Sequence, residues 1–368
     1  MTLRRVRQDL PSPALLLDIA ALEYNIAAMA KWSAAHHVGV RPHTKVHKCV
    51  EIARRQLAAG AVGLTAATVY EAEAMLAASP PEVLIANQVV GEDHLRRLAG
   101  AARATSLIVA MDDAGNAREV SAAAHAAEAV IGVLVEVDVG MGRCGVRSAS
   151  EAVALADEIR GLPNLRLRGV VGYEGHVVLE RDPQLRAQRA QAAMNVLATA
   201  ARAVEAAGHE VEIVSAGGTN TYDMTGVHES VTELQAGTYA VMDTGYAALA
   251  PRFEPVLSVQ ARVLSWKTDT AVLDCGTKAI AVDVTPPSLP PSVGTVREVH
   301  EEHLIADPTP GAALRIGEPV QIAVGYAGGT VNLHDAYYVV DGDDLVGVWP
   351  IVARGPGRTP AVVGEVVT

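Results

Sequence analysis

Short apolar runs alternate with helix-like stretches from about residue 14 to residue 245. The runs are continuous in Val, Ile and Leu, which is typical of parallel strands that are buried on both faces. The stretches between them are rich in Ala, Glu and Arg, and one of them ends at Gly60, a residue type favoured just after a helix. The apolar runs lie at residues 14–19, 38–42, 61–67, 82–90, 106–112, 129–139, 167–175 and 210–218.

Roughly eight such units in about 235 residues predict a (β/α)8 barrel. An open doubly wound sheet is the alternative, because the order of strands in a sheet cannot be read from one sequence. After about residue 250 the apolar runs are separated by Pro- and Gly-containing turns without helical stretches, and residues 286–294 form a predicted loop. We therefore predict an α/β fold, with a TIM-like barrel over residues 10–250 and a mostly-β domain over residues 251–368. Residues 1–9 are assigned to the β domain, which is expected to complete the active site.

The composition excludes several classes of protein. With 30 Lys or Arg and 42 Asp or Glu among 368 residues, the formal net charge is −12. General nucleic-acid binding needs a basic surface and is not expected. The sequence has no run of about 18 or more apolar residues, so no membrane helix is predicted. The first residues lack the apolar core of a signal peptide. Three scattered cysteines are too few for a disulfide framework. We expect a cytoplasmic protein without a membrane partner.

Four polar clusters follow predicted strands, at the ends where a barrel carries its active site. They are RPHTKVHK at residues 41–48, VGMGRCG at 139–145, GYEGH at 172–176 and SAGGTNT at 215–221. Each interrupts an apolar run where a loop is expected to begin. We therefore expect the four clusters to converge on one rim of the barrel.

Lys45 is the strongest candidate for covalent chemistry. It follows a buried strand and is flanked by Arg41, His43, His47 and Lys48. Partial burial among cations lowers the pKa of a lysine and frees its amine for attack on a carbonyl. The alternative is a solvated lysine at the start of a helix.

Two glycine-containing turns have the parts of a phosphate site. SAGGTNT offers consecutive backbone N–H groups and hydroxyls, and LQAGTY at residues 234–239 is placed to close on the same phosphate. Ordinary tight turns are the alternative. In GYEGH, Tyr173 is suited to pack against a planar cofactor and His176 is a candidate general base, although a purely structural histidine fits as well.

Gly140, Gly142 and Gly145 form a literal G-x-G-x-x-G, the pattern of a dinucleotide site. This pattern belongs to a first βα turn, whereas here it comes after several units, so we interpret it as a loop that directs Arg143 into the site. HEEH at 300–303 and LHD are the only His/carboxylate clusters of the β domain, in a region predicted as strand and loop. A metal is not expected there.

Taken together, the motifs resemble one known family over nearly the whole chain. RPHTKVHK, GYEGH, SAGGT, VTELQAGTYAVMD at residues 231–243 and VNLHDAYYVV at residues 331–340 look like the D-threonine aldolase and D-serine dehydratase family. The resemblance implies a fold-type III pyridoxal-phosphate enzyme, with an alanine-racemase-like barrel followed by a β domain. It also implies a homodimer and a small D-amino acid as the substrate.

The resemblance also assigns residue roles. Lys45, the first lysine of RPHTKVHK, would join the cofactor through its amine, and Arg143 would contact the cofactor ring. An Arg at the pyridine nitrogen would keep that nitrogen unprotonated and weaken the electron sink. Tyr173 would lie near the cofactor, and His176 would take the β-hydroxyl proton of the substrate. The expected phosphate cradle consists of Gly217, Gly218, Thr219, Gly237 and Thr238.

One position departs from the family. Its metal ligands, a His and then a Cys or Asp two residues on, precede the TVNLHD stretch, where this chain has Tyr326 and Gly328. Neither residue is a ready ligand for a divalent ion, so we predict no metal at this position. We expect Tyr326 to hydrogen-bond the β-oxygen or the carboxylate of the substrate, or to act as a second acid/base group; simple space-filling is the alternative.

The leading functional prediction is a pyridoxal-phosphate lyase that cleaves a small D-3-hydroxy amino acid into glycine and an aldehyde. A D-serine or D-3-hydroxy amino acid dehydratase is the second possibility, although hydroxide leaves poorly without a Lewis acid. A metal-independent racemase or epimerase is the third. Two alternatives lie outside this class of enzyme: a nicotinamide oxidoreductase and a non-catalytic pyridoxal-phosphate carrier.

Overall fold

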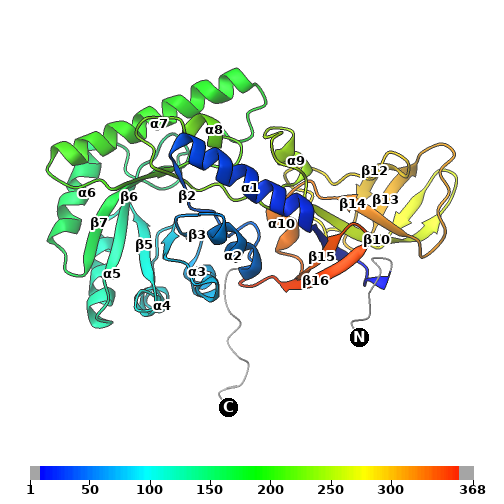
Figure 1. Ribbon diagram of the computed structural model, residues 1–368, viewed down its shortest axis with the longest axis horizontal. Helices are drawn as coiled ribbons and strands as arrows, with labels where there is room; N and C mark the ends of the chain where they lie inside the picture. Colours follow the sequence, from blue (N-terminus) through cyan, green and yellow to red (C-terminus); the bar gives the residue numbers. More distant parts are fainter. Residues whose placement is uncertain (1–8, 356–368) are drawn as a thin grey trace, which may run out of the picture.

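The computed structural model describes residues 9–355, which form two eight-stranded sheets with helices around the first (Figure 1). The first sheet is parallel, in the order β2-β9-β8-β7-β6-β5-β4-β3. It closes where His43, just after β2, forms a parallel bridge with Thr65 of β3. The predicted (β/α)8 barrel is therefore confirmed. Its strands are β2 (Gly39–Val40), β3 (Leu64–Ala66), β4 (Glu82–Ile85), β5 (Ser106–Met111), β6 (Ile131–Glu136), β7 (Leu165–Val171), β8 (Ile213–Ala216) and β9 (Glu233–Leu234).

Several of the barrel helices begin at side chains that cap them. Asp18 accepts a hydrogen bond from Ala21 N at the start of the first helix, and Thr68, Asp113, Ser148 and Asp182 cap later ones. The helices are α1 (Ile19–His36), α2 (Val50–Ala58), α3 (Val69–Met75) with the 3-10 turn η2 (Leu76–Ala78), α4 (Glu92–Ala101), α5 (Ala114–Ala126), α6 (Ala149–Gly161), α7 (Pro183–Ala206), α8 (Tyr222–Thr225) and α9 (Thr244–Ala247).

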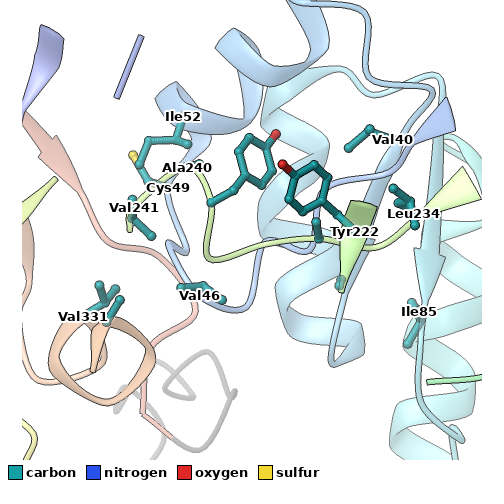
Figure 2. Packing of buried hydrophobic residues seen from close by; sticks show 14 of the residues in the cluster. Val40, Val46, Cys49, Ile52, Ile85, Tyr222, Leu234, Ala240, Val241 and Val331 are labelled. Atoms are coloured by element: carbon teal, nitrogen blue, oxygen red, sulfur yellow. The ribbon is translucent and has the colours of Figure 1, made fainter. Parts of the chain in front are cut away.

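Two packing layers hold the barrel together. The strand side chains that point outward join the helices in the main core, and the inward ones form a smaller layer inside the barrel. Figure 2 shows part of the main core, where Val46 and Cys49 after β2 gather with Val241 and Val331. This core is continuous from the barrel into the second sheet. The inner layer consists of Leu84, Ile108, Ala110, Leu134, Val171 and Ile213.

The second sheet contains a strand that the sequence pattern had assigned to the barrel. β1 (Ala14–Asp18) pairs antiparallel with β10 (Leu257–Trp266) and parallel with β15 (Ala336–Asp341), so residues 14–18 are not a barrel strand. The eighth barrel strand is β9, which lies in a stretch expected to be only a turn. The other strands of this sheet are β11 (Ala271–Leu273), β12 (Gly294–Val299), β13 (Leu304–Pro308), β14 (Pro319–Ala323) and β16 (Asp344–Pro350).

The C-terminal region is mostly strands, as predicted, but it also contains the short helix α10 (Ala327–Val331). Asp243 N-caps α9 through Tyr246 N and also accepts a hydrogen bond from Ala327 N at the start of α10, at 2.7 Å in each case. This one carboxyl group therefore ties the end of the barrel to the β domain. Among the described residues no helix is long and apolar enough to cross a membrane.

Candidate active site

A cavity of about 390 Å³ opens at the C-terminal ends of the barrel strands. This size is within the range of small-molecule sites. The four polar clusters of the sequence do converge here, because parallel strands deliver the loops that follow them to one rim. The predicted residues that line the cavity are Lys45, Arg143, Tyr173, Gly217, Gly218, Thr219, Gly237 and Thr238.

The segment that carries Lys45 is fastened on both sides. Thr44 before it binds Thr65 O through its backbone N–H at 2.8 Å and its hydroxyl at 3.0 Å. Lys48 after it has a φ of 48° and forms a buried ion pair with Glu71 at 2.5 Å. The segment holds the Lys45 amine 5.8 Å from the centre of the Tyr173 ring. Lys45 is therefore placed by its neighbours rather than by a helix or a strand.

Burial lowers the pKa of the Lys45 amine, and the nearby Arg143 cation lowers it further, against a smaller opposing effect of Glu71. The side chain is exposed to the cavity, but the protein around the cavity still removes much of the water from the amine. The buried His43 is neutral near pH 7, because burial and the neighbouring Lys45 hold its pKa well below the usual range. The site thus shifts the Lys45 amine toward its uncharged, nucleophilic form.

The two glycine turns present unpaired backbone donors to the cavity. The backbone N–H groups of Thr219, Gly237 and Thr238 donate to no acceptor among residues 9–355. A Cβ at Gly237 would lie 2.6 Å from the carbonyl oxygen of His43, so the turn has no room for a side chain. Unpaired N–H groups in a glycine-lined hollow suit an anion such as phosphate.

Glu174 organises the turn after β8 and was not singled out in the sequence. Its fully buried carboxylate accepts hydrogen bonds from Gly217 N at 3.2 Å and from the hydroxyls of Thr221 and Thr225, both at 2.6 Å. The only available signal was an acidic residue between Tyr173 and His176 in GYEGH. Glu174 therefore holds in place the loop that presents the Thr219 N–H.

The glycine-rich loop at residues 139–145 does not form a dinucleotide site. Asp138 accepts hydrogen bonds from the backbone N–H groups of Gly140 at 3.1 Å and Gly142 at 2.9 Å, and Asp112 accepts one from Gly145 at 2.8 Å. The groups that would bind a pyrophosphate are therefore already occupied by carboxylates. The loop instead places Arg143 on the cavity, as the sequence analysis favoured.

His176 and Tyr326 lie outside the lining of the cavity. His176 is exposed, and its imidazole packs against Gly140, where a Cβ would lie 3.1 Å from Nε2. Tyr326 is half-buried, and its phenol lies close enough to the cavity residues Tyr173 and Tyr246 to contribute to their raised pKa values. Burial, with Asp283 and Asp243 next, raises the pKa of the Tyr326 phenol. Tyr326 is therefore a hydrogen-bond donor near pH 7.

Residues 17–245 match the family described as alanine racemase, N-terminal domain, and residues 256–340 match the "Putative serine dehydratase domain". The chain is 38% identical over 356 residues to the D-threonine aldolase of an Arthrobacter species, covering 94% of this chain and 93% of that protein. The crystal structure of D-threonine aldolase from Filomicrobium marinum matches with a TM-score of 0.93 and 37% identity, over 96% of this chain and 99% of that one. The D-threo-3-hydroxyaspartate dehydratase of a Delftia species is 30% identical over 280 residues, covering 74% of this chain and 73% of that protein.

The chain belongs to the alanine-racemase-like family that includes D-threonine aldolase. This is a family of pyridoxal-phosphate-dependent enzymes, so the predicted class and cofactor are confirmed. The residues present fit that cofactor: a desolvated amine at Lys45 lies beside Tyr173, and unpaired N–H groups of the cradle face the same cavity. The roles of the individual residues remain predictions.

The residues at the family's metal position do not fit a metal ion. Gly328 has no side chain, and a Cβ there would lie 3.1 Å from the Tyr326 hydroxyl, which folds back over it. In residues 9–355 no three His, Cys, Asp or Glu side chains form a group that could hold a metal. His300 binds Glu298 and His334 binds Ala279 O, both through Nε2. The prediction that no metal binds here stands as a prediction, and no step below uses one.

Several further residues of this family member line the cavity without having been predicted, and they include three polar side chains near barrel-strand ends or in α9. Glu136 ends β6, Gln235 follows β9, and Tyr246 lies in α9. Burial raises the pKa of Glu136, and it raises the pKa of Tyr246 to about 12. Glu136 and Tyr246 belong to no motif singled out in the sequence. Gln235 lies within LQAGTY, but only the glycine and the threonine of that motif were assigned a role.

Proposed function

We propose that this protein is a pyridoxal-phosphate-dependent lyase that cleaves a small D-3-hydroxy amino acid into glycine and an aldehyde. The observation that carries the proposal is the 38% identity to D-threonine aldolase along 94% of the chain, together with a cavity that brings Lys45 and the anion-binding turns together. Pyridoxal phosphate, when bound, stabilises the negative charge that develops on the α-carbon of an amino acid. Binding of the cofactor and proton transfer to and from the substrate are proposed for the residues around the cavity.

In this proposal the uncharged amine of Lys45 holds the cofactor, and the N–H groups of Thr219, Gly237 and Thr238 bind its phosphate. Gly217 and Gly218 line the same hollow, but their own N–H groups donate to Glu174 and to the Thr221 hydroxyl. Arg143 and Tyr173 contact the cofactor. These assignments are supported by the position of all eight residues on one cavity. The lowered pKa of Lys45 supports its role, because only the unprotonated amine is a nucleophile.

His176 is proposed to remove the proton of the β-hydroxyl as the bond between Cα and Cβ breaks. The proposal is supported by the position of His176 on the loop after β7, where its exposed imidazole packs against Gly140. From this position it would meet a substrate from the solvent side. Tyr326 is proposed to donate a hydrogen bond to the β-oxygen, which needs the protonated phenol that its raised pKa provides. This donor takes the place of the metal that the resemblance leads one to expect.

A dehydratase is the second candidate, because a D-threo-3-hydroxyaspartate dehydratase is among the relatives. The aldolase is better supported, since the identity is higher and extends over more of the chain. Release of hydroxide also needs a strong acid at the β-oxygen. A phenol with a raised pKa is a weak proton donor.

Product analysis of the cofactor-loaded, chelator-treated protein with D-threonine tests the proposal. Glycine and acetaldehyde in equal amounts are expected. 2-Oxobutyrate with ammonia would establish the dehydratase instead, and a stereoisomer of threonine alone would establish a racemase. Metal analysis of the protein before chelator treatment is expected to find no stoichiometric divalent ion, and full dependence of the treated protein on an added ion would contradict the metal prediction.

Three variants refine this test. Lys45→Ala is expected to abolish the visible absorbance of the bound cofactor. Tyr326→Phe is expected to lower kcat at least tenfold, while Tyr24→Phe, a matched change at an exposed position of α1, leaves it unchanged. Full activity of Tyr326→Phe would reduce Tyr326 to a space-filling residue.

The proposal includes a homodimer in the cytoplasm, with no nucleic-acid or membrane partner. Its support is the family resemblance and the acidic composition, with 42 acidic against 30 basic residues. Sedimentation analysis of the loaded enzyme is expected to give twice the mass of one chain. Cell fractionation tests the location.

A further inference from the structure

A chain of hydrogen bonds runs through the barrel interior and ends at the cavity. The buried Arg41 donates to both carboxylate oxygens of Glu233, through Nε at 2.9 and 3.0 Å and through Nη2 at 2.8 Å. Ser215 Oγ binds Glu233 Oε1 at 2.8 Å, and Gln235 Nε2 binds Ser215 Oγ at 2.9 Å. We call Arg41, Glu233, Ser215 and Gln235 the barrel relay. Its first three members are buried, and Gln235 lines the cavity.

Only one assignment of donors and acceptors fits the barrel relay. Glu233 is paired with the guanidinium of Arg41, so it is a carboxylate that can only accept. Ser215 has a single hydroxyl proton, which it donates to Glu233, so its lone pairs face Gln235. Gln235 must then donate to Ser215 through its NH2 group. The orientation of the Gln235 amide therefore follows from its hydrogen-bond partners, without a separate assignment of the amide nitrogen and oxygen.

This orientation leaves the carbonyl oxygen of Gln235 as an acceptor without a donor among residues 9–355. Most of the strand-end residues that line the cavity are small and apolar, and the other side-chain acceptors at the strand ends are Asn87 and Glu136. Gln235 also comes two residues before Gly237, whose N–H belongs to the anion cradle. The apolar residues of this part of the cavity are Ala67, Ala86, Ala110 and Val171.

We propose that Gln235 accepts a hydrogen bond from the protonated ring nitrogen of pyridoxal phosphate, and that the barrel relay holds its carbonyl oxygen in place for this. The inference rests on the cofactor site of the proposed function, and it is independent of which substrate bond breaks. An amide oxygen repels an unprotonated ring nitrogen and binds a protonated one, because both bare atoms carry lone pairs. A protonated ring withdraws electrons more strongly from the α-carbon.

This assignment competes directly with Arg143. A guanidinium can only donate, so Arg143 at the ring nitrogen would require that nitrogen to be unprotonated. Gln235 with its carbonyl oxygen at the ring nitrogen requires the opposite state. The protonation state of one atom therefore distinguishes the two arrangements, in a sample that contains no substrate.

The test is nitrogen NMR of the enzyme loaded with pyridoxal phosphate that carries ¹⁵N in its ring. Protonated and unprotonated ring nitrogens resonate far apart, with the protonated form upfield. The wild-type enzyme is expected to show the upfield signal at pH 7. A downfield signal in the wild type would overturn the proposal at once, without any variant.

Four variants show whether Gln235 is responsible. Gln235→Met keeps the length of the side chain but removes the acceptor, and it is expected to move the signal downfield. Gln235→Glu supplies a stronger acceptor and is expected to keep the signal upfield. Ser215→Ala frees the amide to turn, so a smaller downfield movement is expected. Gln191→Met, the same change at an exposed position of α7, is the matched control and is expected to give the wild-type signal.

A wild-type signal in folded Gln235→Met would also overturn the proposal, and it would point to Glu136, the carboxylate that lines the same cavity. If Gln235→Met fails to fold, Ser215→Ala decides, and an unchanged signal there refutes the relay. A role of the relay in folding alone would lower stability without moving the signal. Loss of lyase activity is not the readout, so failure of the aldolase assay and failure of this inference are separate results.

Discussion

Replacing Glu174 should damage the cofactor site more than its distance from the chemistry suggests. Its carboxylate receives three hydrogen bonds from the loop after β8, one from Gly217 N and two from the hydroxyls of Thr221 and Thr225. In Glu174→Ala the N–H of Gly217 keeps no partner in a buried position. The two hydroxyls can turn, and Thr221 already lies 3.4 Å from another acceptor, Gly218 O.

The size of the effect follows from these contacts. An orphaned buried N–H costs about 1–3 kcal/mol, and each hydroxyl that loses a charged partner about 1 kcal/mol, so Glu174→Ala should lower the free energy of unfolding by about 3–5 kcal/mol. In Glu174→Gln the amide oxygen can face Gly217 while the NH2 group donates to the two hydroxyls, which then accept. That variant should lose only about 1 kcal/mol.

Urea unfolding of the apoprotein, followed by circular dichroism, measures these free energies. Titration with pyridoxal phosphate should show an affinity at least tenfold weaker in Glu174→Ala, because the loop that presents the Thr219 N–H loses its anchor. Glu210→Ala, at an exposed position before β8, is the matched control. An alanine variant within about 0.5 kcal/mol of the wild type, which is the usual range for surface changes, would refute the reasoning. Equal losses in the alanine and glutamine variants would refute it too.

Two further predictions concern the cofactor site. Arg143→Ala removes the cation that lowers the pKa of Lys45, so the pH at which the apoprotein reacts half-maximally with pyridoxal phosphate should move upward, whereas Arg143→Lys should leave it nearly unchanged. Stopped-flow absorbance across the pH range measures this, and the same midpoint in both variants would contradict it. Gly237→Ala places a Cβ 2.6 Å from His43 O and should weaken cofactor binding at least tenfold, as followed by fluorescence titration. Gly161→Ala, with open space around its Cβ, should bind the cofactor normally, and equal affinities would argue against the cradle.

Much of the architecture was accessible from local patterns. Continuous apolar runs identify strands that are buried on both faces, and parallel strands of that kind with helices between them form a barrel or an open sheet. Polar clusters directly after such runs must lie at one edge of the sheet, which is why Lys45, Arg143 and Tyr173 could be predicted to meet. The structure does place them on one cavity.

Strand partners were not accessible in the same way. The run at 14–18 has the apolar pattern of a barrel strand, yet it pairs with β10 and β15, more than 200 residues away. The true eighth strand, β9, is only two residues long and too short to show a pattern. The local sequence indicates whether a strand is buried, and long-range packing determines which strands it pairs with.

The sequence by itself determined the class of the fold and the rim at which the polar clusters meet, because both depend on residue type and short-range order along the chain. It also singled out Lys45 as the candidate reactive lysine, a role that stays a prediction. Only the tertiary structure decided that Glu174 anchors the anion cradle and that Gln235 ends a relay from Arg41 through Glu233 and Ser215. The members of the relay come from residues as far apart in the chain as 41 and 235. A hydrogen bond between such residues depends on distances of about 3 Å, and no spacing in one sequence specifies those.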